Sequence, residues 1–287
     1  MRRIIVTGGS GQLATAIRRS ANTSHNSYQA LNHKELDVCD ASSIEQAIEG
    51  ADVVINCAAY TDVEGAESDM ANAMRVNDEG VHNLAAACAR RGVTLVHIST
   101  DYVFGGDSER RTPYSEEDTP QPINAYGISK LAGERHVTKL EHGIVIRTSW
   151  LYAPWGNNFC LKMLRLMGER DAIRVVNDQH GTPTSALGLA DTLVHLVDSN
   201  AIANMQGVYH YSDGGSCSWY DFATEIARQS TSGCNIEPCS SADYPTKARR
   251  PEYSVLDTQR IYAIEGTIKR AWHDRLTDVI EIIECKL

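Results

Sequence analysis

The first twenty residues place a short apolar strand directly before a glycine-rich turn and a helical segment. Residues 2–7 are rich in β-branched side chains, as is typical of a buried strand. The turn contains Gly8, Gly9 and Gly11, and the helical pattern continues to about Arg19. Such a turn lets backbone N–H groups approach a pyrophosphate at the N-terminus of the helix. The segment therefore predicts the first unit of a dinucleotide-binding α/β fold.

Strands and helices alternate through the first half of the chain. Residues 52–59 and 94–98 are apolar strand patterns, and residues 71–91 form a long helical pattern between them. Residues 42–45 predict a capping box that opens a further helix. This alternation predicts a Rossmann-like, doubly wound parallel sheet over residues 1–150.

The pattern becomes less regular after residue 150. Helices are predicted at 186–199 and 219–229, among mixed proline, glycine and aromatic residues. We interpret residues 151–287 mainly as a smaller α+β substrate-binding lobe that leans over the edge of the sheet. The chain is expected to return to the sheet within residues 173–200, near 173–177.

Composition excludes several classes of protein. The net charge of −10 argues against a nucleic-acid-binding surface. The eight cysteines include no Cys-x-x-Cys and the ten histidines no His-x-x-x-His, so no metal site is expected. No apolar run approaches the length of a membrane span, and the first strand begins where a signal peptide would need its charged region. We expect a cytoplasmic protein with free thiols.

Two short motifs carry groups suited to carbonyl chemistry. Ser99, Thr100 and Asp101 follow a strand, and Tyr126 and Lys130 are one helical turn apart, on the same face of a helix. Hydride chemistry on a carbonyl needs a hydroxyl that holds the oxygen and an acid that protonates it. A protonated lysine is expected to lower the pKa of the phenol below its usual value of about 10. The Tyr-Lys spacing also arises by chance, and it gains weight from the glycine turn.

The end of the second predicted strand bears on the choice of cofactor. Residues 28–31 form that strand, and Asn32, His33 and Lys34 follow it. An NAD-selective site usually has a carboxylate here, which binds the ribose hydroxyls. Asn32 is neutral, while His33 and Lys34 can face a 2′-phosphate. The pattern favours NADPH, with NADH also possible; alternatively, Lys34 is simply solvated.

Residues 247–251 are the densest basic cluster of this acidic chain. A guanidinium group suits a diphosphate, which points to a nucleotide-linked substrate; the alternative is that the cluster is a solvated charged loop. Asn157 and Asn158, before Phe159, have the character of an ordinary helix N-cap.

Several segments together resemble the extended short-chain dehydrogenases/reductases, and more closely the branch that reduces nucleotide-linked 4-keto-6-deoxy sugars. The resemblance covers essentially the whole chain. The segments that carry it are residues 11–13, 56–64, 99–104, 126–134, 147–150, 177–184 and 249–251.

The resemblance implies roles for individual residues. Tyr126 would be the general acid, Lys130 would bind the nicotinamide ribose and tune Tyr126, and Thr100 would hydrogen bond the keto oxygen of the sugar. The residues expected to line the cofactor are Gly8, Gly11, Gln12, Leu13, Asn32, Asp37, Val38, Ala58, Ala59, Tyr60, Thr61, Tyr126 and Lys130. Those expected to contact the substrate are Val63, Glu64, Thr100, Asp101, Trp150 and Arg250, with Arg250 at the diphosphate.

The reaction so implied is NADPH-dependent reduction of dTDP-4-dehydro-β-L-rhamnose to dTDP-β-L-rhamnose. The alternatives are another nucleotide-sugar 4-ketoreductase, an epimerase or dehydratase of the same superfamily, or a non-catalytic NAD(P)-binding regulatory subunit. Dehydration usually needs a second carboxylate after Asp101, where this chain has Tyr102. Members that dimerise around Mg²⁺ carry an acidic residue where Thr15 and Ala16 stand. We therefore expect no structural metal, and a monomer and a homodimer both remain open.

Overall fold

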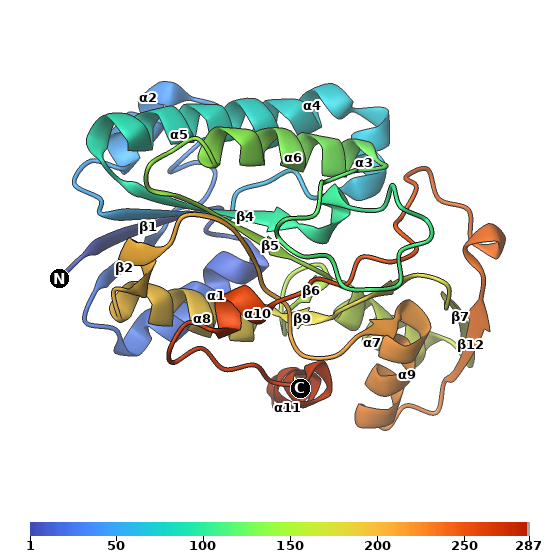
Figure 1. Cartoon of the computed structure of the whole chain (residues 1–287). Helices are drawn as coiled ribbons and strands as arrows, with labels where there is room; N and C mark the ends of the chain where they lie inside the picture. The colour runs from blue at the N-terminus through green and yellow to red at the C-terminus, as the bar shows by residue number, and fades with distance from the viewer. Residues whose placement is uncertain (286–287) are drawn as a thin grey trace.

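A six-stranded sheet forms the centre of the computed structural model, which describes residues 1–285 (Figure 1). Its strands are β1 (Arg3–Thr7), β2 (Ser27–Ala30), β3 (Val53–Asn56), β4 (Thr94–Thr100), β5 (Gly143–Thr148) and β10 (Gly207–His210). They lie in the order β10-β5-β4-β3-β1-β2, and every neighbouring pair is parallel. The chain continues from β1 to β2 on one side and returns to β3 on the other. The expected doubly wound parallel fold is confirmed.

Helices cover both faces of this sheet (Figure 1). The apolar side chains of α1 and α8 pack with Ile4, Val6 and Ile55 on one face. Those of α2 and α5 pack with Ile5, Val54 and Leu95 on the other, where α6 also contacts β4. The helices of the two faces are α1 (Gln12–Ser20) and α8 (Ala186–Asp198), then α2 (Ala41–Ala47), α5 (Gly80–Arg91) and α6 (Ala125–Val137).

The single helix expected over residues 71–91 is interrupted. The chain forms α3 (Val63–Ser68) and α4 (Met70–Met74), then a π-helical turn, η2 (Arg75–Glu79), before α5 begins. A π-helical turn admits one extra residue and turns a side chain away from the regular helical row. Here the buried side chain is Asn77. The 3.6-residue pattern alone did not reveal this interruption.

The cap of α2 is also two residues earlier than expected. Asp40 is the N-cap, and its carboxylate accepts a hydrogen bond from the backbone N–H of Ser42. The capping box expected at 42–45 is therefore wrong, because Asp40 already satisfies the free N–H of the first turn.

A second cluster of elements lies below and to the right of the main sheet in Figure 1. Its core contains Phe222, Trp272, Leu276 and Met163, from three helices. The elements are β6 (Leu151–Tyr152), α7 (Phe159–Glu169), β7 (Ala172–Val176), β8 (His180–Gly181), β9 (Thr184–Ser185), β11 (Cys217–Ser218), α9 (Trp219–Gln229), β12 (Asn235–Cys239) and α11 (Trp272–Glu284). A short helix, α10 (Gln259–Tyr262), packs beside β10.

The return to the main sheet is not where we expected it. Residues 173–177 fall largely in β7, which pairs with β12 in a separate two-stranded sheet. The strand that joins the main sheet is β10, beside β5. A short alternating strand indicates one buried face but not the sheet that it joins, so this position was wrong. Within 173–200 it is α8 whose apolar side chains pack on the main sheet. The division of the chain at residue 150 stays a prediction. The last two residues of the predicted second part, 286 and 287, lie outside the described residues.

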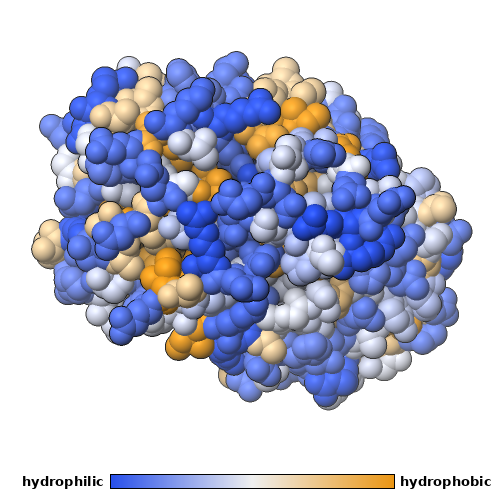
Figure 2. Space-filling model, in the orientation of Figure 1, coloured by the Kyte–Doolittle hydropathy of each residue, from blue (hydrophilic) through white to orange (hydrophobic). Residues whose placement is uncertain are grey.

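The face in Figure 2 is mostly hydrophilic, and its hydrophobic residues form small separate patches. Within residues 1–285, no helix is long and apolar enough to cross a membrane.

We expect Phe222→Ala to lower the free energy of unfolding by about 3–5 kcal/mol, because it removes a fully buried ring from the second core. Urea denaturation followed by circular dichroism measures the change. Tyr244 is 51% exposed, so Tyr244→Ala is the matched control and should change the value by less than about 0.5 kcal/mol. Equal effects of the two substitutions would contradict this account of the core.

Candidate active site

The glycine turn lies where the strand order reverses, between β1 and β3. Gly8 has a φ of +66°, and a Cβ at this position would lie 2.9 Å from the backbone nitrogen of Ala58. The turn after β1 and the loop after β3 are thus in direct contact. Open α/β sheets bind their ligands at such a switch point, outside the carboxyl ends of the strands. The close backbone packing fits the phosphate-binding turn that a dinucleotide requires.

The residues after Gly8 divide into two kinds. Gly11 is the N-cap of α1, and the Gln12 side chain contacts the 155–158 loop, with Oε1 accepting a hydrogen bond from Asn158 at 2.8 Å. Leu13 and Val38 instead place their side chains in the hydrophobic core. Contact between either residue and a cofactor would therefore use the backbone. Asn158 is also the N-cap of α7, as its pattern suggested.

The loop after β3 is held by a residue that the sequence analysis missed. The N–H of Tyr60 donates to Asn77 Oδ1 at 2.9 Å, and Asn77 Nδ2 donates to the carbonyl of Tyr60 at 3.0 Å. Asn77 Nδ2 also donates to Ser129 Oγ in α6. Ala58, Ala59 and Thr61 share this loop. The π-helical turn places Asn77 where it fixes the loop, and no sequence pattern marked that turn.

Residues 32–35, which were expected to contact the adenosine ribose, form a tight turn. The N–H of Asn32 donates to Glu35 Oε2, and Asn32 Oδ1 accepts from the N–H of Lys34. His33 and Lys34 are exposed. Asp37 accepts from the N–H of Cys39. The His33 ring lies 3.7 Å from the Asp37 carboxylate, and the exposed Lys34 side chain could meet a phosphate at the surface.

Thr100, Asp101 and Tyr126 lie together at the carboxyl end of β4. The Thr100 hydroxyl donates to Asp101 Oδ1 at 3.1 Å and also interacts with the phenol of Tyr126. Ser254, from the second half of the chain, donates to Asp101 Oδ2 at 2.6 Å. The ring of Tyr102 packs edge-on against that of Tyr126, with centroids 5.9 Å apart. Sequence reasoning selected the first three residues and missed Ser254, which is far away in the chain.

The expected pKa shift of Tyr126 was wrong in direction. Burial raises the pKa of Tyr126 to about 12, against the hydrogen bond with Thr100, which lowers it. The Nζ of Lys130 donates to the carbonyl of Ile98 at 2.7 Å and lies 3.3 Å from His97 Nε2. Desolvation outweighs the effect that we attributed to the lysine. Tyr126 therefore keeps its proton across the neutral range.

Lys130 itself is almost completely buried. Burial lowers its pKa to about 8, against Glu134 and Cys57, which raise it. Glu134 is in turn paired with Arg147 in a buried ion pair at 2.7 Å. The ammonium thus lies against β4, near Cys57 at the end of β3.

The basic cluster folds over the same region. Arg250 Nη2 donates to Glu64 Oε1 at 2.9 Å and is also close enough to Tyr102 to hydrogen bond with it. The backbone N–H of Lys247 donates to Glu64 Oε2 at 2.8 Å. Arg250, Glu64 and the Tyr102–Tyr126 pair therefore form one continuous group. Val63, the first residue of α3, stands beside Glu64.

Trp150 belongs to a separate aromatic group. Its ring stacks on Trp219 with centroids 3.4 Å apart, and its backbone φ is +44°. A Cβ on Gly181 would come within 2.5 Å of the Trp150 ring, so the indole fills the space that this glycine leaves. The structure does not bring Trp150 into the hydrogen-bonded group around Tyr126.

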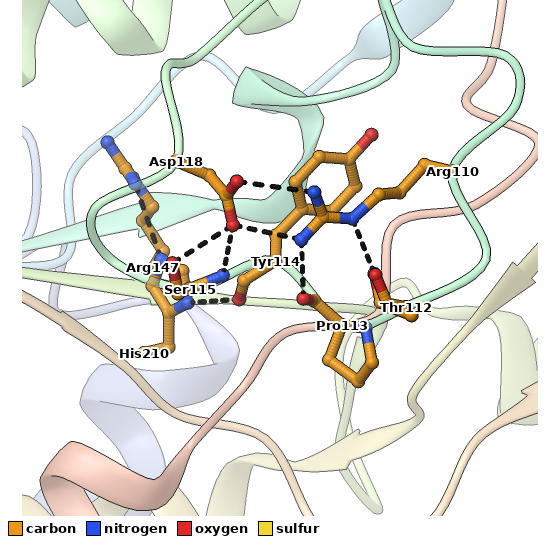
Figure 3. A network of polar contacts seen from close by, with 8 residues as sticks. All are labelled: Arg110, Thr112, Pro113, Tyr114, Ser115, Asp118, Arg147 and His210. Carbon is orange, nitrogen blue, oxygen red and sulfur yellow. Dashed lines mark hydrogen bonds and ion pairs between the residues drawn. The ribbon is translucent and has the colours of Figure 1, made fainter.

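A further polar network joins the 104–124 loop to β5 and β10 (Figure 3). The Arg110 guanidinium binds the Asp118 carboxylate at 3.0 Å and carbonyl oxygens of its own loop. His210 Nδ1 lies 3.1 Å from the carbonyl of Tyr114, and its Nε2 lies 3.3 Å from Arg147. Burial lowers the pKa of His210 to about 3, with Arg147 adding to the effect. The neutral ring donates to Tyr114 and accepts from Arg147, and it joins the 104–124 loop to β5.

Within residues 1–285, no group of three or more His, Cys, Asp and Glu side chains is arranged to hold a metal ion.

The raised pKa of the Asp101 carboxyl predicts that the stability of the protein depends on pH. Burial raises its pKa to about 7, against hydrogen bonds from Ser254 and Thr100, which lower it. The native state thus binds the proton more tightly than the unfolded state, and the resulting stabilisation is lost as the pH rises from about 4 through 7. Asp101→Asn cannot ionise, so it should raise the free energy of unfolding at pH 8 and change it little at pH 4.

Urea denaturation at the two pH values measures this difference. Glu109→Gln, at an exposed position, is the control and should give the same small change at both. An Asp101→Asn effect that is independent of pH would contradict the assignment.

Comparisons with known proteins agree with this geometry. The family model described as the RmlD substrate binding domain matches residues 1–285. The chain is 39% identical over 283 residues to the dTDP-4-dehydrorhamnose reductase of Streptomyces griseus, covering 96% of this chain and 92% of that protein.

Solved structures extend the comparison. A dTDP-4-dehydrorhamnose reductase from Clostridium acetobutylicum is 36% identical, with a TM-score of 0.92 and coverage of 98% of this chain and 99% of that one. The Bacillus anthracis dTDP-4-dehydrorhamnose reductase, solved in complex with NADP, is 36% identical with a TM-score of 0.90 and covers the same shares. The expected resemblance is confirmed, and this chain belongs to the dTDP-4-dehydrorhamnose reductase family.

Proposed function

We propose that this protein reduces dTDP-4-dehydro-β-L-rhamnose to dTDP-β-L-rhamnose with NADPH. The observation that carries the proposal is that Thr100 and Tyr126 interact at the carboxyl end of β4, where Lys130 Nζ binds the carbonyl of Ile98. The relatives named above are dTDP-4-dehydrorhamnose reductases, and one of them was solved with NADP. The pattern after β2, which lacks a carboxylate at Asn32 and exposes Lys34, agrees with NADPH.

Each residue of the site has a separate role in the proposed reaction. NADPH supplies the hydride that reduces C4 of the sugar. Thr100 holds the keto oxygen and Tyr126 donates a proton to it as negative charge develops. The pKa of Tyr126, about 12, keeps the phenol protonated and available as a donor. Lys130 binds the nicotinamide ribose and provides positive charge next to the reacting groups.

The substrate would lie between the two halves of the chain. Asp101, Val63 and Glu64 line its sugar end, and Arg250 binds the diphosphate. Arg250 already pairs with Glu64, so the incoming diphosphate would compete with that carboxylate for the guanidinium group. Trp150 would contact the nucleotide or sugar from the aromatic group around Trp219.

Two observations favour reduction over the alternatives. Dehydration needs a carboxylate next to Asp101, and that position holds Tyr102, whose ring packs on Tyr126. A purely regulatory cofactor-binding protein has no need of the Thr100–Asp101–Tyr126 group, which is complete here. All eight cysteines carry free thiols, in agreement with the reducing cytoplasm that we propose as the location.

We expect Tyr126→Phe to lower kcat about 10²–10⁴-fold while the Kd for NADPH stays nearly unchanged, because only the proton donor is lost. The assay follows NADPH oxidation with dTDP-4-dehydro-β-L-rhamnose, and fluorescence titration gives the Kd. Tyr244→Phe, at an exposed tyrosine, should match the wild type. Near-normal turnover by Tyr126→Phe would end the assignment. NADPH binding with no oxidation by the wild-type protein would favour a regulatory role.

The choice of cofactor has its own test at Lys34. Lys34→Glu should raise the KM for NADPH roughly two- to fivefold through charge repulsion, on the scale of one exposed charge contact. The KM for NADH, which has no 2′-phosphate, should change little. Lys139→Glu, at another exposed lysine, controls for the change in net charge. Equal effects on the two cofactors would place the 2′-phosphate away from Lys34.

A further inference from the structure

A row of buried polar side chains crosses three neighbouring strands and ends at Lys130. Thr7 Oγ1 donates to Asn56 Oδ1 at 2.6 Å, and Asn56 Nδ2 lies 3.0 Å from His97 Nδ1. His97 Nε2 lies 3.3 Å from Lys130 Nζ. At the other end, Thr7 Oγ1 accepts from the backbone N–H of Ala58 at 3.0 Å. The row therefore connects the loop after β3 to the buried ammonium.

The sheet register builds this row. Thr7 pairs with Asn56 between β1 and β3, and Asn56 pairs with His97 between β3 and β4. All three side chains are at most 1% exposed. Burying a polar group costs free energy unless every hydrogen bond is satisfied, so apolar residues would suit these positions better for stability alone. The charged group that the row contacts is Lys130.

The ring of His97 is uncharged. Burial lowers the pKa of His97 well below its usual value, and Lys130 adds to the effect. A neutral imidazole has one donor nitrogen and one acceptor nitrogen. A protonated Lys130 requires Nε2 to accept, so Nδ1 must then donate to Asn56 Oδ1. A neutral Lys130 allows Nε2 to donate, with Nδ1 accepting from Asn56 Nδ2.

The two arrangements occupy the same sites, but with the Asn56 amide turned its Nδ2 donates to Thr7 Oγ1, in place of Oδ1 accepting from that hydroxyl. Rotation of the Asn56 amide exchanges its oxygen and nitrogen, and the proton of His97 changes from one ring nitrogen to the other. The row thus offers hydrogen bonds to either charge state of the lysine.

We propose that His97, held from behind by Asn56 and Thr7, is a positioning residue that fixes the Nζ of Lys130 and adapts its tautomer to the charge of that lysine. The importance of this positioning of Lys130 for catalysis rests on the function proposed above, in which Lys130 binds the nicotinamide ribose. The positioning itself does not depend on that function.

Other groups also face Lys130, and they stay in place when His97 is changed. Glu134 faces it from α6 and Cys57 from the end of β3, and both favour the charged form. Glu134 is held by Arg147. The carbonyl of Ile98 accepts from Nζ whichever side chain occupies position 97.

The test uses the full-length protein without cofactor. The ¹³C resonance of the Lys130 ε-carbon, assigned by its loss in Lys130→Met, reports the titration of that lysine. The wild-type midpoint should lie near 8. His97→Leu should lower it by about one pH unit or more, because the buried ammonium loses an acceptor. His97→Gln, whose side-chain amide can accept near the position of Nε2, should keep the midpoint close to that of the wild type.

Activity gives an independent readout. The alkaline limb of the pH profile of kcat/KM should move down with the midpoint in His97→Leu and return in His97→Gln. Equal midpoints in folded His97→Leu and the wild type would overturn the proposal. If the wild type fails to oxidise NADPH with the sugar nucleotide, the proposed function falls, while the titration still decides the role of His97.

A second measurement needs no substitution, and it applies if His97→Leu does not fold. The ¹⁵N spectrum of His97 in the wild type should show Nε2 changing from acceptor to donor over the pH range in which Lys130 titrates. A tautomer that stays constant over that range, or a charged imidazolium, would overturn the proposal.

Discussion

The parallel arrangement of the strands determines where everything else in this protein can be. In a parallel sheet the carboxyl ends of all strands lie at one edge. The glycine turn follows β1, the 58–61 loop follows β3, and Thr100 ends β4, so these segments lie at one edge of the sheet although more than ninety residues separate the first from the last. The strand order reverses between β1 and β3, which opens the crevice there. Helix α6, which carries Tyr126 and Lys130, packs against β4.

Burial is the second constraint, and it sets the charges in the site. The same desolvation raises the pKa of Tyr126 and Asp101 and lowers that of Lys130 and His97. Each shift favours the neutral form, since charge is costly away from water. The site therefore holds a phenol that keeps its proton and a lysine that loses its charge at mildly alkaline pH. Buried partners such as Glu134 moderate this effect without reversing it.

The second half of the chain completes the site through one short segment. Residues 247–254 contain both Arg250, which binds Glu64, and Ser254, which binds Asp101. A single loop thus reaches two parts of the first half of the chain. In the function proposed above, the sheet would provide the reacting groups and this loop would contribute substrate contacts from the second half of the chain.

Local patterns were sufficient for much of this structure. The glycine turn, the alternating elements and the Tyr126–Lys130 spacing depend on neighbours within one or two turns, so the sequence alone predicted the doubly wound fold and selected Thr100, Asp101 and Tyr126. It did not reveal the π-helical turn at Asn77 or the strand that returns to the main sheet at β10. It also missed Ser254 and His97, and it predicted the wrong direction for the pKa of Tyr126. These features depend on which segments pack together and on how far each group is removed from water, and only the tertiary structure decides both.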